Sequence, residues 1–449
     1  MKDKVDLVIS GGLLCKGDGI MKADIAIGDG LIVEVEKEIV AEPSCPTIDA
    51  SGKLILPGVI DVHVHPVYLD DMQTLSQSAA WGGVTALIHY IYVNPGTKVV
   101  EALKDAIEEG SRTSLLDFGL HASLFDVDNQ MAEIPEVMRL GVTSFKMFMA
   151  YAKLGRAVSD RQLLEAMEAI AAHQGLAIVH AENGVMADYL EEKIKGEGYD
   201  SPAVYSRTRP NVVEAEAVFR VISLASVVGC PLYLPHLSAK ESLAPVRMAR
   251  EKGQSLYAET CPQYLSLTEA ELERQGTLAK IAPPLRKEED VEALWRALRE
   301  GLIDVIGSDH APKAKDRGED ILAATFGAPG VETVLTVTYD EGVNKGKIPP
   351  CHLVRFLSEN PAKIFGLYPQ KGAIEVGSDA DLIIFDPNFS HTISQTGQHS
   401  KAGYTLYEGR SCLGAPVLSM QRGKVLLEEG KLKGSPGQGQ FLKTAYASQ

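Results

Sequence analysis

Two histidines separated by a single residue, His63 and His65, are the strongest local signal for chemistry in the sequence. They stand at the end of an apolar run that has the length and composition of a β-strand. Side chains two positions apart in a strand point to the same side, so both imidazoles can bind one metal ion. The pair alone is weak evidence, because two histidines also occur on surface strands without any function.

Three further candidate ligands follow other strand-like runs. His180 ends the run Leu-Ala-Ile-Val-His, His236 ends Leu-Tyr-Leu-Pro-His, and Asp309 follows Asp-Val-Ile-Gly-Ser. One such histidine would be read as a hydrogen-bonded core residue, but four histidines and an aspartate in equivalent places make coincidence a poor explanation. Imidazole and carboxylate ligands suit zinc and similar divalent metals. The pattern therefore predicts a metal site where the ends of the strands meet.

Lys146 lies inside the apolar run Ser-Phe-Lys-Met-Phe-Met, where a buried ammonium group is costly. One interpretation is a lysine whose charge reaches solvent or pairs with a nearby carboxylate. The other is that its neutral amine adds carbon dioxide and becomes a carbamate, an anionic ligand whose two oxygens can bridge two metals. The residues alone leave both interpretations open.

The elements that position these residues alternate between strand-like and helix-like runs, which is typical of parallel βαβ units. Eight strands are predicted, at residues 55–64, 84–92, 115–122, 143–149, 176–180, 232–236, 255–259 and 304–307. Helical patterns separate them, for example at residues 160–173, 212–228, 239–252 and 288–299. Eight repeats favour an α/β fold of the (β/α)8 TIM-barrel type over an open doubly wound sheet, and such barrels hold their chemistry at the C-terminal strand ends.

Both ends of the chain are instead rich in short strands and turns. We therefore predict a smaller composite β-sandwich domain formed from both termini, residues 1–56 with 367–449, beside a barrel of residues 57–366. The tail after Lys433 is rich in Gly, Ser and Gln, which predicts a mobile segment or an arm onto a neighbouring subunit.

Composition restricts the partners. The formal net charge is −16, which argues against a nucleic-acid partner. Apolar runs are of strand length and too short to span a bilayer, so no membrane partner is predicted. The six cysteines form no CxxC pair, which indicates reduced thiols and a cytoplasmic location.

Several motifs together resemble those of the cyclic amidohydrolases of the amidohydrolase superfamily, and most of all those of the hydantoinase and dihydropyrimidinase branch. The motifs are residues 61–65 (DVHVH), 144–151 (SFKMFMAY), 180–184 (HAENG), 259–265 (ETCPQYL), 283–286 (PPLR) and 308–312 (SDHAP). The resemblance extends over nearly the whole chain. It implies an enzyme that opens the amide bond of a small cyclic amide or ureide and that forms a homodimer or homotetramer.

The resemblance also implies a role for each candidate residue. Two divalent metal ions would be bound. Zinc is the expected metal, and manganese, cobalt and iron are the alternatives. His63, His65 and Asp309 would hold the more buried metal, His180 and His236 the second, and the carbamate of Lys146 would bridge both. A metal-bridging hydroxide would attack the carbonyl, with Asp309 as general base and then acid. Tyr151 would stabilise the oxyanion, and Ala282 and Phe326 would contact the substrate through their backbone.

Some positions depart from the family pattern and leave the substrate open. Dihydroorotases carry an arginine where this chain has Val67, which argues against that activity. The stretch between His65 and Gly82 is several residues shorter than we expect in hydantoinases. Phe326 stands where relatives often carry Asn. The alternatives are an allantoinase-like or other amide hydrolase on the same metal centre, or a non-catalytic dihydropyrimidinase-related scaffold protein, against which the complete ligand set argues.

Overall fold

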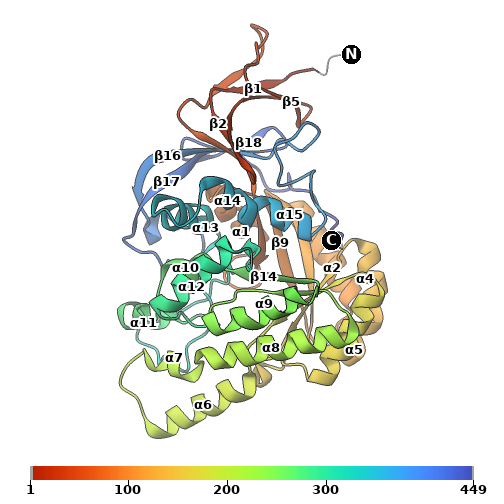
Figure 1. Ribbon diagram of the computed structural model, residues 1–449, viewed down its shortest axis with the longest axis vertical. Helices are drawn as coiled ribbons and strands as arrows, with labels where there is room; N and C mark the ends of the chain where they lie inside the picture. The colour runs from red at the N-terminus through yellow and green to blue at the C-terminus, as the bar shows by residue number, and fades with distance from the viewer. Residues whose placement is uncertain (1–3, 447–449) are drawn as a thin grey trace.

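Eight buried parallel strands form the centre of the computed structural model, which describes residues 4–446 (Figure 1). In sheet order they run from β15 back to β8, each beside its sequence neighbour. The strands are β8 (Val59–Val64), β9 (Val84–Val93), β10 (Asp117–Leu124), β11 (Ser144–Phe148), β12 (Leu176–His180), β13 (Leu232–Leu234), β14 (Leu256–Thr260) and β15 (Val305–Ile306). A parallel bridge between Val64 and His310 joins the first strand to the segment after the last. The sheet is therefore closed, which confirms the predicted barrel.

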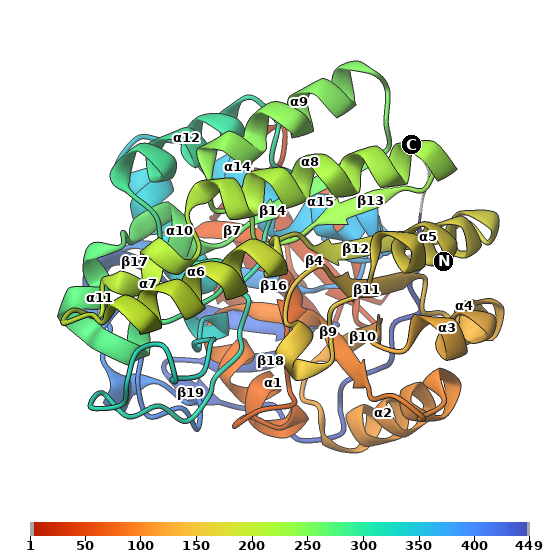
Figure 2. The same cartoon turned by 90° about the horizontal axis from the view of Figure 1, so that it is seen from below.

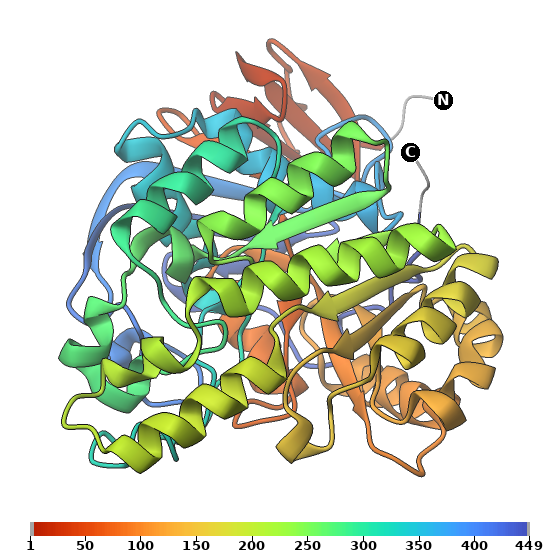
Figure 3. The same ribbon diagram turned by 60° about the horizontal axis from the view of Figure 1, so that its bottom comes forward.

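Helices surround the strands, as the view from below shows (Figure 2). They are α1 (Met72–Trp81), α2 (Val99–Thr113), α3 (Val127–Gln130), α4 (Ile134–Leu140), α5 (Asp160–Ala172), α6 (Gly184–Glu197), α7 (Val204–Thr208), α8 (Asn211–Val228), α9 (Leu243–Glu251), α10 (Pro262–Ser266), α11 (Ala270–Gln275), α12 (Glu288–Arg299), α13 (Val334–Tyr339), α14 (Pro350–Val354) and α15 (Asn360–Ile364). Helices α8 and α9 pack side by side on the outside of the barrel (Figure 3). Among residues 4–446, no helix is both long and apolar enough to cross a membrane.

Helix α5 illustrates how the sequence encodes this layer. Ser159 caps it by accepting a hydrogen bond from the backbone of Gln162, whose side chain in turn accepts from the backbone N–H of Ser159. Its apolar residues recur at helical spacing and are buried, namely Leu163, Ala166, Met167 and Ile170. Covered by helices outside and packed inside, strands such as β10 and β12 are buried along their whole length.

Two further sheets lie above the barrel in Figure 1, one built from N-terminal strands alone and one from strands of both ends of the chain. One sheet contains β1 (Leu7–Ser10), β4 (Asp24–Gly28), β5 (Leu31–Glu36) and β6 (Thr47–Asp49). The other contains β2 (Leu13–Lys16), β3 (Gly19–Lys22), β7 (Leu54–Pro57), β16 (Leu382–Thr392), β17 (Ser411–Gln421), β18 (Lys424–Glu428) and β19 (Lys431–Leu432). Their shared core joins residues from both ends of the chain, including Ile9, Ile25, Ile384 and Met420.

The prediction of a single first strand at residues 55–64 is wrong, because the structure has two strands there, β7 and β8. Residues up to Pro57 pair with β16, and only those from Val59 onward join the barrel. Gly58 separates them. A Cβ atom there would lie 2.0 Å from the Thr85 hydroxyl oxygen, so only glycine allows the chain to pass so close to β9.

The predicted mobile tail is also wrong, because residues 434–446 run along the barrel of the same chain. The backbone N–H of Phe118 donates to Gln440 and its carbonyl accepts from Leu442, at 2.9 and 2.7 Å. A Cβ atom on Gly439 would lie 2.0 Å from the carbonyl oxygen of Leu116. The small residues that suggested mobility instead allow the tail backbone to approach the barrel closely.

Candidate metal centre

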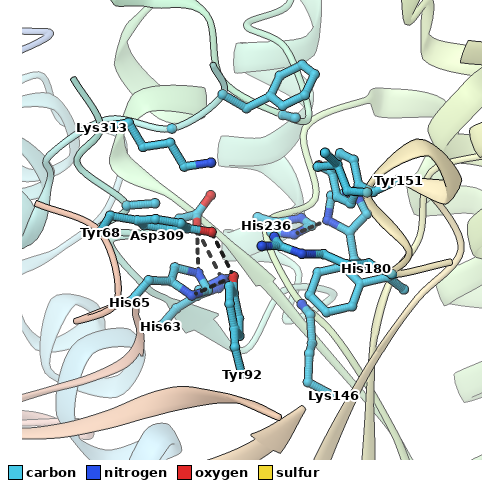
Figure 4. Close-up of a pocket in the computed structure, with 17 residues that line it drawn as sticks. His63, His65, Tyr68, Tyr92, Lys146, Tyr151, His180, His236, Asp309 and Lys313 are labelled. Atoms are coloured by element: carbon cyan, nitrogen blue, oxygen red, sulfur yellow. Dashed lines mark hydrogen bonds and ion pairs between the residues drawn. The ribbon is translucent and has the colours of Figure 1, made fainter. Parts of the chain in front are cut away.

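All nine site residues predicted from the sequence line a single cavity at the C-terminal ends of the barrel strands (Figure 4). They are His63, His65, Lys146, Tyr151, His180, His236, Ala282, Asp309 and Phe326. Active sites of (β/α)8 barrels form at this end because loops from all eight strands converge there. The cavity lining also includes Tyr68, Tyr92, Arg156 and Lys313, to which sequence reasoning assigned no role.

One side of the cavity brings together His63, His65 and Asp309. Their nearest ligand atoms all lie within 4.8 Å of one another. Oδ1 of Asp309 is 3.1 Å from Nε2 of His63 and 3.3 Å from Nε2 of His65. Burial disfavours a charged imidazole, but the carboxylates of Glu259 and Asp309 outweigh it and raise the pKa of His63 to about 9. The same two carboxylates would attract a metal cation, which must displace the proton before the His63 ring can bind it.

The opposite side of the cavity holds His180 and His236. Nδ1 of His180 lies 2.9 Å from Nε2 of His236, and both rings are buried. Burial lowers the pKa of both imidazoles, His236 most strongly. Two neutral rings whose nitrogens face one point can direct lone pairs at a common cation.

Lys146 lies in the middle of β11 with only 1% of its surface exposed. Within residues 4–446 no carboxylate comes within ion-pair distance of its amine. The nearest aromatic groups are the rings of Tyr90 and Phe148, whose centroids are each 5.1 Å from Nζ. Burial lowers the pKa of this lysine to about 7, against the opposing charges of Glu259 and Asp309. The geometry rules out a lysine that reaches solvent and leaves a nucleophilic amine facing the cavity.

Two buried carboxylates hold the histidines in place, and sequence reasoning missed both. Oε1 of Glu259 is 2.6 Å from Nδ1 of His63 and also accepts the backbone N–H of His236. Oε2 of Glu182 is 2.9 Å from Nε2 of His180 and 2.7 Å from the guanidinium of Arg209. Their signal was present, because each lies in a quoted motif, ETCPQYL or HAENG. Such carboxylates fix the ring orientation of metal-binding histidines.

Three of the site residues have left-handed backbone conformations that side chains rarely adopt. The φ angles are 69° at Tyr151, 44° at His236 and 50° at Asp309. Conformations of this kind carry a cost of about 1–3 kcal/mol and concentrate at functional sites. They turn the chain sharply at the strand ends, which points these side chains into the cavity.

Tyr151 lies beside His180. The centroid of its ring is 4.9 Å from that of His180 and 5.8 Å from that of Phe326. Burial, with the charge of Glu182 nearby, raises the pKa of the Tyr151 phenol well above its usual range. The hydroxyl therefore stays protonated and can donate a hydrogen bond to a ligand in the cavity.

Two neighbouring positions are separated from the cavity. His310 has both ring nitrogens engaged, Nε2 with Asp70 at 3.0 Å and Nδ1 as acceptor for Gly330 at 3.1 Å, and it does not line the cavity. It thereby supports the loop that carries Asp309. Val67 has 41% of its surface exposed and does not line the cavity either.

The residues present fit a site for divalent metal ions. Four imidazoles and a carboxylate face one cavity, and nitrogen and oxygen donors of this kind are preferred by zinc and related ions. Buried carboxylates support the histidines on both sides, as is usual for metal-binding imidazoles.

Comparison with known proteins agrees with this geometry. The model of the amidohydrolase family matches residues 54–426. The chain is 39% identical to the D-hydantoinase of Ralstonia pickettii, over 98% of this chain and 99% of that protein. It is 36% identical to the L-hydantoinase of Paenarthrobacter aurescens, over 97% and 98%. A solved D-hydantoinase structure matches with a TM-score of 0.94 at 38% identity, covering 99% of this chain and 100% of that one.

Proposed function

The chain belongs to the amidohydrolase family, and we infer that it is a metal-dependent hydrolase that opens the amide bond of a cyclic amide or ureide. The observation that carries this inference is the convergence of four histidines, Lys146 and Asp309 on one cavity at the C-terminal mouth of the barrel. The relatives named above support hydantoins or dihydropyrimidines as the substrate type.

Two metal positions are proposed. His63, His65 and Asp309 would hold one ion, and His180 and His236 would hold the other. The carbamate of Lys146 would supply anionic oxygen ligands. Within residues 4–446 the Lys146 amine has no carboxylate at ion-pair distance, and burial lowers its pKa to about 7. Both observations support this modification, because the neutral amine is the form that adds carbon dioxide. Zinc is the proposed ion.

Each residue then has a role in the reaction. When bound, the metals lower the pKa of water and polarise the amide carbonyl. Asp309 accepts the proton of the attacking water as the new carbon–oxygen bond forms. It returns that proton to the ring nitrogen as the carbon–nitrogen bond breaks. The Tyr151 hydroxyl donates to the carbonyl oxygen, where negative charge develops. Backbone groups of Ala282 and Phe326 position the ring.

A substrate screen with the zinc-loaded protein tests the proposal. Hydantoin, dihydrouracil and allantoin are supplied, and ring opening is followed by loss of ultraviolet absorbance and by chromatography of the product. We expect turnover of hydantoin or dihydrouracil, and Asp309→Asn should reduce it at least about 10²-fold, the lower range for general acid–base catalysis. Turnover of allantoin alone would favour an allantoinase-like enzyme, and turnover of none would contradict the proposed function.

Three further proposals accompany the activity. Residues 1–56 and 367–449 form one structural domain and residues 57–366 the other. The chain assembles as a homodimer or homotetramer, which light scattering after gel filtration tests. All six cysteines are unpaired in the structure, which supports a reducing compartment such as the cytoplasm.

A further inference from the structure

Two cationic side chains at the mouth of the cavity have no part in the proposed reaction. Lys313 lies a few positions after Asp309 in the sequence, and Arg156 lies a few positions after Tyr151. Both line the cavity and both are half-buried. Figure 4 shows Lys313 extending into the space beside Asp309. A ligand bound in the cavity would therefore lie near both positive charges.

Neither cation is neutralised by another residue in the described part of the chain. Within residues 4–446, neither Arg156 nor Lys313 has a carboxylate within ion-pair distance. Lys153, three residues before Arg156, is more exposed and nevertheless pairs with Asp188 and Glu192. Among the described residues that line the cavity, Asp309 alone carries a carboxylate, and the proposed metal site requires it. Half-buried charges without a partner are costly unless a ligand supplies one.

The two cations are fixed in position by aromatic rings. Nζ of Lys313 lies 4.2 Å from the centroid of the Tyr68 ring, and the guanidinium carbon of Arg156 lies 4.8 Å from that of Tyr92. The two phenol oxygens are 3.2 Å apart, and that of Tyr92 is 3.1 Å from Nδ1 of His65. Stacking on a ring holds a cation in place without neutralising its charge. The cations are thus anchored, through the two tyrosines, to a predicted metal ligand.

We propose that Arg156 and Lys313 form an anion subsite, and that the preferred substrates are cyclic ureides whose ring substituent ends in a carboxylate. This proposal rests on the proposed function and names its substrate class. A carboxylate matches the planar fork of Arg156 and the point charge of Lys313. Val67 stands where dihydroorotases carry an arginine, and it lies outside the cavity lining, whereas Arg156 and Lys313 lie within that lining and come from other segments of the chain.

A pair of matched substrates tests the subsite. The first is a hydantoin whose C5 atom carries a –CH2CH2–COO⁻ group, and the second carries the neutral –CH2CH2–CONH2 group of nearly the same shape. We would measure kcat/KM for ring opening, and the Kd of each compound by calorimetry, with the zinc-loaded protein. The variants are Arg156→Gln, Lys313→Gln, the double variant and the charge-retaining Arg156→Lys. Lys153→Gln is the matched control, because Lys153 is a neighbouring lysine outside the cavity lining.

In the unsubstituted protein, we expect the acid to exceed the amide in kcat/KM and in affinity by roughly 10–100-fold, the range for a hydrogen bond to a charged group. Each Gln variant should reduce this preference, the double variant should abolish it, and Arg156→Lys should retain part of it. Lys153→Gln should leave it unchanged. Equal handling of acid and amide by the unsubstituted protein would overturn the subsite while leaving the proposed function intact. Loss of turnover on both compounds, with tighter binding of the acid retained, would overturn the proposed function and support the subsite.

Discussion

Oε1 of Glu259 lies 2.6 Å from Nδ1 of His63, although 196 positions separate the two residues in the chain. His63 is on β8 and Glu259 is on β14, and both side chains are buried. Oε2 of the same carboxylate accepts the Tyr233 hydroxyl at 2.6 Å, and Oε1 accepts the backbone N–H of His236. One glutamate therefore orients a predicted ligand from each side of the cavity.

Glu259→Gln should weaken metal binding without removing any proposed ligand. The amide has nearly the same shape but cannot present two acceptor oxygens, so the orientation of His63 becomes less fixed. Loss of such a supporting carboxylate typically costs about 10–100-fold in metal affinity or activity. Zinc affinity by competition with a chelating dye, together with kcat/KM, checks this. Glu289→Gln, an exposed glutamate, is the control, and unchanged zinc affinity in Glu259→Gln would contradict the assigned role.

The sequence predicted which residues converge on the cavity but not which side chains orient them. The convergence of His63, His65, His180, His236 and Asp309 was predictable because each ends or follows a strand-like run, and strand ends meet in a barrel. The pairing of Glu259 with His63 depends on two strands that lie far apart in the chain, and no local pattern specifies that distance.

The sequence also contained no indication that two cationic side chains would line the mouth of the cavity. Arg156 and Lys313 lie in loops, where residue spacing carries no periodic signal. The break at Gly58 and the packing of the tail against Phe118 also depend on contacts between distant segments. Positions set by strand periodicity were therefore predictable, while those set by tertiary contact were not.

Lys146→Ala should lose most of the bound metal. The variant removes both the proposed bridging carbamate and its attachment point, so each metal would lose one anionic ligand. Elemental analysis should show depleted zinc, and native mass spectrometry of the unsubstituted protein should show the added mass of carbon dioxide. A short carboxylic acid in solution should restore part of the activity by filling the vacated space. Full zinc content in Lys146→Ala would contradict the bridging role, and Lys153→Ala is the control.

The metal-free protein should become more stable as the pH rises above 7, and Lys146 should cause part of this change. Burial lowers the pKa of Lys146 from 10.5 in the unfolded chain to about 7 in the folded protein. Between these values the unfolded chain binds one more proton, so raising the pH increases the free energy of unfolding. Below about pH 7 the lysine is protonated in both states, and its destabilising effect is constant and largest.

Urea unfolding of chelator-treated protein in buffers free of carbon dioxide, from pH 6 to pH 10, measures this dependence. Lys146→Met lacks the titrating amine, so it should be more stable than the unsubstituted protein at pH 6 and 7. Its advantage should shrink steadily toward pH 10. A constant difference between the two proteins over this range would show that Lys146 is not buried as an unpaired amine.

Tyr151→Phe should reduce turnover while leaving metal content and folding unchanged. The hydroxyl is the only group removed, and burial together with Glu182 holds its pKa high, so it acts as a neutral hydrogen-bond donor rather than as a base. A donor directed at a developing oxyanion contributes more to the transition state than to the bound substrate. The loss should therefore fall mainly on kcat, by about 10²–10³-fold, with a smaller change in KM. Steady-state kinetics on hydantoin, zinc analysis and thermal unfolding check the three parts of this expectation.

The control is Tyr189→Phe, since Tyr189 has 65% of its surface exposed and does not line the cavity. A rise in KM with unchanged kcat would assign Tyr151 to substrate binding alone, because a contact equally strong in the ground state and transition state cannot alter kcat.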